Sequence, residues 1–123
     1  MLNSVITPEN ARFEALRQEL RRGCLVLGVL SALRTEQYGY TLRKQLARMG
    51  LEMDEGTLYP LLRRLESQGL LTSEWREHEK RNKRFYRLSE TGAQALAQLS
   101  GDWQALSRAI AEIQMEAHHA VGG

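Results

Sequence analysis

The segment from Asp54 to Gly69, DEGTLYPLLRRLESQG, constrains the fold of this chain more than any other stretch. On a helix, where successive residues are about 100° apart, its leucines fall along one side. Its arginines and small residues spread over the other side. A helix of this kind packs on a core along its leucines and presents the opposite face to a partner or to solvent. The leucines are Leu58, Leu61, Leu62 and Leu65.

Pro60 leaves two possible starting points for this helix. If the helix begins at Glu55, the proline removes the hydrogen bond that its amide would donate to Gly56, and it crowds that turn. If Thr57 is the N-cap, Pro60 occupies the third helical position, where no donor is lost. In both cases we expect the N-terminal end of the helix to be exposed and Gly69 to follow its last turn.

Two strands separated by a basic loop are expected after the helix. The first alternates through Leu71, Ser73 and Trp75. The segment HEKRNKR, residues 78–84, is too polar for a core and predicts the hairpin loop. Residues 76–87 hold six Lys or Arg and two Glu, a local charge of +4 in a chain of net charge +2. A helix-turn-helix followed by such a hairpin is the winged-helix arrangement, whose second helix enters the DNA major groove while the hairpin contacts phosphates.

Two helices are expected before this block. CLVLGVLSAL is apolar on nearly all sides and predicts a central buried helix that begins after an interruption at Gly23. YGYTLRKQLARMG predicts the next helix, with Leu42, Leu46 and Met49 directed inward. Its polar side either crosses a phosphate backbone or simply faces solvent. The side chains suited to crossing the phosphate backbone are Arg43, Lys44 and Arg48, and Tyr40 is expected at phosphates together with Arg43 and Lys44.

Residues 1–22 are expected to form an N-terminal arm and a further helix. Thr7 supplies an N-cap, Pro8 suits the first helical position, and Glu9 favours the positive end of the helix dipole. The apolar stripe of this helix is too narrow for a core helix, so it must lie against its own domain or a second subunit. The stripe consists of Phe13, Leu16 and Leu20.

A long last helix is predicted over residues 89–118, with capping chemistry at its start. Its apolar residues are spaced alternately by three and four positions for three heptads, as in a coiled coil. A helix that packs on its own domain has a wider and less regular stripe. We therefore expect a dimerisation helix, followed by a disordered tail at residues 119–123. The seam consists of Leu96, Leu99, Trp103, Leu106, Ile110 and Ile113.

The composition is that of one globular domain, since 42% of the 123 residues are hydrophobic and 26% are charged. The longest apolar run, residues 24–33, is about half as long as a membrane span. A single cysteine cannot form an internal disulfide, which favours a reducing, cytoplasmic location. The sequence holds no phosphate loop, nucleophile motif or metal-ligand spacing, so we expect neither an enzyme nor a cofactor or metal site.

These segments together resemble the PadR-type transcriptional regulators. The resemblance rests on EGTLYPLLRRLESQGLL, SEW, KRFYRLSETG and a long helix with a tryptophan, preceded by RRGCLVLGVLSAL and YGYTL. It covers about residues 21–110. It implies a mostly α fold with a small β-hairpin, in which a winged helix-turn-helix domain occupies residues 23–88. It also implies a homodimeric repressor in the bacterial cytoplasm, of the short class with a single C-terminal dimerisation helix.

The resemblance assigns base reading to residues 55–68 and the wing to residues 78–84. It further implies that a flat hydrophobic effector can bind between subunits beside Trp103, although a tryptophan there also serves as a plain interface anchor. The residues expected at the bases are Gly56, Thr57, Tyr59, Pro60, Arg63 and Arg64. The wing residues expected at phosphates are Lys80, Arg81, Asn82, Lys83 and Arg84.

Within the wing, two contacts per subunit are expected, from Arg81 and Lys83 at the tip on either side of Asn82. Lys80 or Arg84 would instead pair with a glutamate across the hairpin, at position 77 or 79. The sequence thus favours a sequence-specific regulator that binds double-stranded DNA as a homodimer. The alternative is a winged-helix module that binds protein. The basic hairpin beside two arginines of the preceding helix favours phosphate.

Overall fold

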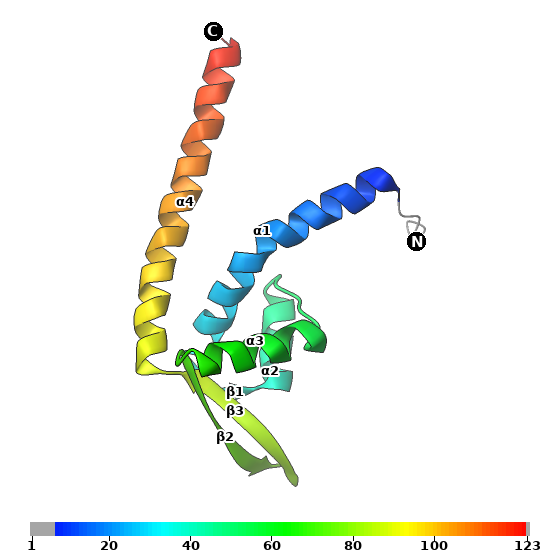
Figure 1. The fold of residues 1–123 in the computed structure, drawn as a ribbon, viewed down its shortest axis with the longest axis vertical. Helices are drawn as coiled ribbons and strands as arrows, with labels where there is room; N and C mark the ends of the chain where they lie inside the picture. The colour runs from blue at the N-terminus through cyan, green and yellow to red at the C-terminus, as the bar shows by residue number, and fades with distance from the viewer. Residues whose placement is uncertain (1–6, 123) are drawn as a thin grey trace.

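The computed structural model describes residues 7–122, and their side chains as far as Glu116. The elements are α1 (Pro8–Ala32), β1 (Gln37–Tyr38), α2 (Gly39–Arg48), α3 (Glu55–Ser67), β2 (Leu71–His78), β3 (Arg81–Leu88) and α4 (Glu90–Gly122). Helices α1 and α4 rise from one side of the domain that the other elements form, and the β2–β3 hairpin projects from the opposite side (Figure 1). The expected winged-helix fold, mostly helical, is confirmed.

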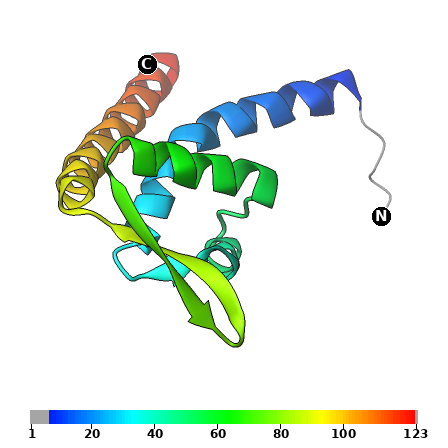
Figure 2. The same ribbon diagram turned by 60° about the horizontal axis from the view of Figure 1, so that its bottom comes forward.

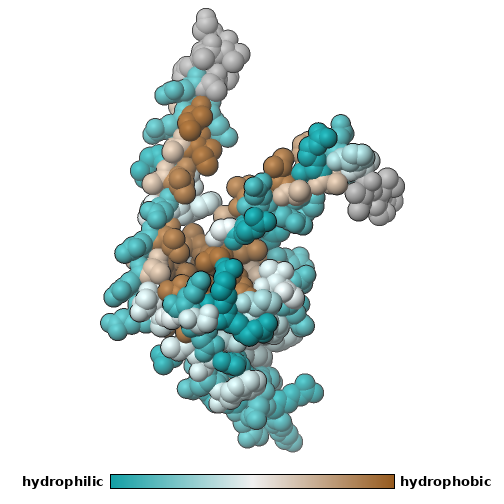
Figure 3. Space-filling view, viewed as in Figure 1, coloured by the Kyte–Doolittle hydropathy of each residue, from teal (hydrophilic) through white to brown (hydrophobic). Residues whose placement is uncertain are grey.

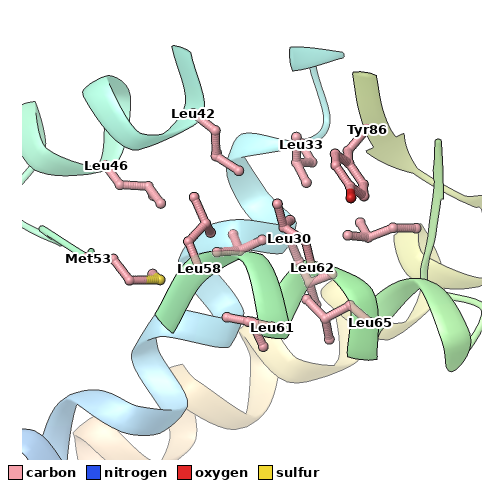
Figure 4. Packing of buried hydrophobic residues seen from close by; sticks show 12 residues of the cluster. Leu30, Leu33, Leu42, Leu46, Met53, Leu58, Leu61, Leu62, Leu65 and Tyr86 are labelled. Atoms are coloured by element: carbon pink, nitrogen blue, oxygen red, sulfur yellow. The ribbon is translucent and has the colours of Figure 1, made fainter. Parts of the chain in front are cut away.

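The core lies between α3, the C-terminal part of α1, and α2 (Figure 4). All four leucines of the α3 stripe are buried, as predicted. Leu71 and Tyr86 close the core from the sheet. Removing a buried leucine from such a core typically costs about 2–5 kcal/mol. The core therefore fixes which face of α3 remains outside. The other buried hydrophobic residues of the core are Val29, Leu30, Leu33, Leu42, Leu46 and Met53.

Helix α1 is continuous, so the predicted interruption at Gly23 is wrong. A single glycine inside a helix costs only about 1 kcal/mol relative to alanine, and long helical sequences on both sides of it outweigh that cost. The predicted start is confirmed, because the Thr7 hydroxyl accepts a hydrogen bond from the Asn10 amide at 3.0 Å and Pro8 is the first helical residue. Residues 1–6 of the expected arm lie outside the described residues.

Helix α3 begins at Glu55, which decides between the two starts that the sequence left open. The N-cap is Asp54, whose Oδ1 accepts a hydrogen bond from the Thr57 amide at 2.8 Å. Hydrogen bonding to Thr57, through its side chain and then its amide, lowers the pKa of Asp54. Pro60 therefore lies inside the helix. The cap and the leucine stripe hold α3 in place despite the lost backbone hydrogen bond.

The sheet has three antiparallel strands in the order β1-β3-β2, so it is larger than the expected hairpin. Strand β1 is two residues long and directly precedes α2. A two-residue strand is too short to show an alternating pattern. In α2, Leu42 and Leu46 are buried as predicted. Met49 is exposed, so its predicted inward direction is wrong; the helix ends at Arg48, and Met49 is its C-cap.

The β2–β3 hairpin, called the wing below, turns through only two residues, Glu79 and Lys80. Both have positive φ angles, of 55° and 66°. The pairing runs from Leu71 opposite Leu88 to His78 opposite Arg81. The predicted seven-residue loop over 78–84 is therefore wrong, since most of it belongs to strands. Polar residues can form these strands because the hairpin projects from the domain and little of it contacts the core.

Helix α4 starts where the wing and α3 meet. Its N-cap hydroxyl, on Ser89, accepts a hydrogen bond from the Gly92 amide at 2.9 Å, and the Ser89 amide donates to the Leu70 carbonyl at 3.0 Å. Leu96 packs partly buried against the core. The helix continues to Gly122, through most of the tail predicted to be disordered, and Gly123 lies outside the described residues. In the described part of the chain, no helix is long and apolar enough to cross a membrane.

Candidate nucleic-acid interface

The exposed face of α3 divides into two sides. Tyr59 and Arg63 line a groove of about 670 Å³ between α3, the start of α2 and the wing. We call this the wing groove. Thr57, Pro60 and Arg64 line a second groove, which α3 shares with α1. The residues predicted to read bases are thus split between the two flanks of one helix. A Cβ atom at Gly56 would make an ordinary contact with Asp54 Oδ1, at 3.8 Å.

Tyr59 is held against the start of α2. A Cβ atom at Gly39 would overlap the Tyr59 hydroxyl, so the ring occupies space that only glycine leaves free at that position. Arg43 of α2 makes a second tie to α3 through an ion pair with Glu55, with Nη1 3.0 Å from Oε2. Helices α2 and α3 therefore present one joined surface. The expected phosphate contact of Arg43 has to compete with this ion pair.

The other two α2 residues predicted at phosphates lie together. Tyr40 is exposed. The ammonium group of Lys44 lies 5.2 Å from the centre of its ring. A cation over a tyrosine ring keeps its charge and remains available to a phosphate.

Arg84 ties the wing to α3. Its Nη2 lies 3.1 Å from Glu66 Oε1, and its Nε donates to Ser73 Oγ at 2.8 Å. Ser73 in turn donates to Glu66 Oε2 at 2.7 Å, which closes a three-residue network. The guanidinium also lies 5.7 Å from the ring of Trp75. The expected pairing of Arg84 with Glu77 or Glu79 is wrong, because α3 offers a carboxylate nearer to it.

Lys83 also has partners within the protein, and it does not lie at the wing tip. Its side chain is only 20% exposed, with Nζ 3.5 Å from Glu79 Oε1 and 4.3 Å from the centre of the Tyr38 ring. Asn82 is exposed within β3 and does not mark the turn. The tip consists of Glu79 and Lys80, with Arg81 next to it. The predicted tip of Arg81, Asn82 and Lys83 is therefore displaced by two residues.

Arg76 supports the sheet on the face away from α3. Its Nη2 lies 2.6 Å from both Glu36 Oε2 and Glu74 Oε2, and its guanidinium is 4.4 Å from the Phe85 ring. The hydrogen bond from Arg76 lowers the pKa of Glu36. The basic count of the wing therefore overstates its free charge. Sequence reasoning had no signal for this role, because Glu36 lies 40 residues away in the chain.

Four cations, on α3 and at or beside the wing tip, form no ion pair with the side chains that the structure describes. They are Arg63, Arg64, Lys80 and Arg81. Two of them come from α3 and two from the wing tip. All four are exposed. Such groups can neutralise phosphates or pair with guanine edges without first breaking an internal ion pair.

The described residues hold no cluster of three or more His, Cys, Asp or Glu side chains that could bind a metal ion. Tyr86 has its pKa raised by burial, as expected for a core tyrosine. The wing groove is lined by aromatic rings and guanidinium groups. This chemistry suits binding of a polyanion with exposed aromatic bases or sugars.

Comparison with known proteins gives the family. Residues 26–98 match the model of the transcriptional regulator PadR-like family. The chain is 37% identical over 106 residues to the transcriptional regulator Rv3488 of Mycobacterium tuberculosis, covering 85% of this chain and 96% of that protein. A PadR family transcriptional regulator from Eggerthella lenta is 41% identical, with a TM-score of 0.80 over 85% of this chain and 94% of the other.

A PadR-like transcription factor from Bacteroides fragilis is 30% identical, with a TM-score of 0.69. The match covers 80% of this chain and 98% of that protein's chain. The matched residues include α2, α3 and the wing, which together form the surface described above. The chain therefore belongs to the PadR-like family of transcriptional regulators, a family of DNA-binding proteins and not of enzymes.

Proposed function

We propose that the protein is a cytoplasmic repressor that binds a specific double-stranded DNA operator as a homodimer. The observation that carries this proposal is the position of the unpaired cations. Arg63 of α3 and Arg81 of the wing line the same groove. The exposed α3 face suits the major groove, and the wing tip suits the adjacent phosphates. Figure 2 shows that the wing follows the C-terminal end of α3 and projects away from the far end of α4.

The exposed seam of α4 supports the homodimer. From Leu99 to Ile113 its apolar residues are between 39% and 66% exposed. The narrow apolar stripe of α1 is also exposed, at Phe13, Leu16 and Leu20. Hydrophobic surface follows the side of α4 that faces α1 and gathers where the two helices meet (Figure 3). A second copy, related by a two-fold axis, offers the same two helices in return and can cover both stripes.

The direct test is selection of operators by the purified full chain from a random library of duplex DNA, followed by a binding titration. We expect enrichment of a palindrome with two half-sites, bound by one dimer. Binding of all sequences with equal affinity would contradict sequence-specific readout. Absence of binding to any duplex at low salt would favour the alternative, a protein-interaction module.

Arg63→Ala should reduce operator affinity by about 1–3 kcal/mol if its guanidinium pairs with a guanine edge. Arg63 projects into the wing groove, whereas Arg64 lies on the α1 side of the helix. We therefore expect Arg63→Ala to relax preference at one operator position and Arg64→Ala to weaken all sequences alike. Selection repeated with each variant measures both effects. Unchanged preference in Arg63→Ala would assign it to phosphate.

The wing should contribute affinity through Lys80 and Arg81. Each neutralised phosphate changes the slope of log affinity against log salt by roughly 0.9, so the double alanine variant should lower the slope by about 3–4 per dimer. Lys83→Ala is the matched control, since its ammonium group is already paired with Glu79. We expect that variant to change the slope little. A salt titration of wild type and both variants on one set of operators measures these slopes. If Lys83→Ala lowered the slope as much as the loss of Lys80 or Arg81 does, this division of roles would be contradicted.

Repression would follow from occupancy of a promoter by the dimer. A flat hydrophobic effector would bind beside Trp103, which is half exposed on the seam of α4. We favour the simpler role of Trp103 as an interface anchor, because a tryptophan fills such a position without a ligand.

A further inference from the structure

We infer that Trp75 contacts DNA directly, with its indole packed against apolar surface of the duplex at the edge of the groove that α3 enters. That apolar surface is offered by deoxyribose carbons and by thymine methyl groups. The inference rests on the DNA binding proposed above. It adds an uncharged aromatic contact to a surface otherwise described by its cations.

The position of Trp75 is the first reason. Its side chain is 64% exposed, although it is one of only two tryptophans in the chain. It lines the wing groove together with Tyr59 and Arg63 of α3. A single exposed apolar residue is ordinary on a protein surface. The exposed indole shares this groove with the unpaired guanidinium groups of Arg63 and Arg81, so one partner in the groove can contact all three.

The fixed surroundings of the indole are the second reason. Trp75 lies two residues after Ser73, so both side chains are on the same face of β2. Ser73 and Glu66 hold Arg84, and the Arg84 guanidinium lies 5.7 Å from the indole ring. The held guanidinium beside the ring favours one orientation of the indole before any partner arrives. A preorganised aromatic side chain loses little conformational entropy on binding, which favours its use as a contact.

The charges around the groove favour nucleic acid over a protein partner. Arg63 and Arg81 form no ion pair among the described side chains, while Arg84 and Lys83 are neutralised by Glu66 and Glu79. The free charge in the groove that the indole lines is therefore positive. A duplex brings both phosphates and sugar carbons into such a groove, which matches this combination of free cations and an apolar ring.

The test compares Trp75→Ala with wild type on the selected operator. We expect affinity to fall about tenfold, the loss typical of one aromatic contact to nucleic acid. The slope of log affinity against log salt should stay unchanged, because no phosphate contact is removed. Trp75→Phe should restore most of the affinity. Thr72→Ala, on the opposite face of the same strand, is the matched control and should bind as wild type does.

Direct contact can be observed by fluorine NMR of the protein labelled with 5-fluorotryptophan. Trp75→Phe identifies the Trp75 resonance, which should shift on addition of operator duplex. Replacing operator thymines by deoxyuridine, one at a time, distinguishes the two apolar surfaces. A loss at one position in wild type that is absent in Trp75→Ala places the indole on a thymine methyl group. No loss at any position places it on deoxyribose.

Wild-type affinity of a folded Trp75→Ala variant would overturn the inference, as would a loss of affinity that comes with a reduced salt slope. The second outcome would mean that Trp75 acts only by positioning Arg84 or its neighbours. Failure of the wild-type protein to bind any duplex would instead overturn the proposed function. Circular dichroism of each variant establishes that the fold is retained.

Discussion

Ile110→Glu is expected to convert the dimer into a monomer and to abolish tight operator binding. Ile110 lies within the exposed α4 seam, between Leu106 and Ile113, so a two-fold interface places two carboxylates in apolar surroundings. An unpaired charge transferred into such an interface costs about 3 kcal/mol or more. Binding of two half-sites then loses the advantage of a preformed pair. Sedimentation velocity and an operator titration measure the two effects.

Ala105→Glu is the matched control for this substitution. Ala105 lies on the same helix, is exposed, and falls away from the seam at helical spacing. It adds the same charge without entering the proposed interface, so it should leave the dimer intact. If Ile110→Glu remained a dimer at the same concentration, the interface would have to lie elsewhere, and the heptad seam would no longer explain assembly.

Gly92→Ala is expected to destabilise the junction between α4 and the winged-helix domain. A Cβ atom at this position would overlap the carbonyl oxygen of Leu70, which also accepts the hydrogen bond from the Ser89 amide. Backbone atoms cannot rotate out of the way as a side chain can. Overpacking of this kind typically costs about 1–3 kcal/mol. Because α4 carries the proposed dimer interface, its displacement would also change the separation of the two DNA-binding surfaces.

Gly101→Ala provides a control of opposite sign in the same helix. A Cβ atom at Gly101 meets nothing within 4 Å. This substitution should therefore stabilise α4 by up to about 1 kcal/mol through helix propensity. Thermal unfolding monitored by circular dichroism compares the two variants. Equal behaviour of Gly92→Ala and Gly101→Ala would show that the junction with Leu70 is not tightly packed.

The sequence determined the features that depend on local periodicity and capping. The leucine stripe of α3, the buried Leu42 and Leu46 of α2, and the N-cap at Thr7 all follow from residues within one or two turns of each other. The family motifs agree with these patterns, and the family match confirms the winged-helix regulator. Such features are predictable because the interactions that stabilise them join neighbours in the chain.

The tertiary structure decided how the wing is built and which cations are free. Pairing across the wing placed Lys83 and Arg84 in a strand, although their polarity indicates a loop. Arg84 forms an ion pair with Glu66 of α3, and Arg76 forms one with Glu36, which lies far away in the chain. A count of basic residues cannot distinguish a charge that is already paired from one that awaits a phosphate.

The same limit applied to the helices. The glycine at position 23 predicts a break, yet packing of the C-terminal part of α1 on the core and the helical sequence before it keep α1 continuous. Trp75 had the pattern of an ordinary strand residue until α3 and the wing placed it in a groove beside unpaired arginines. Local sequence determined which elements form. Which side chains remain free to act was decided by contacts between residues distant in the chain, because only the fold brings their partners within reach.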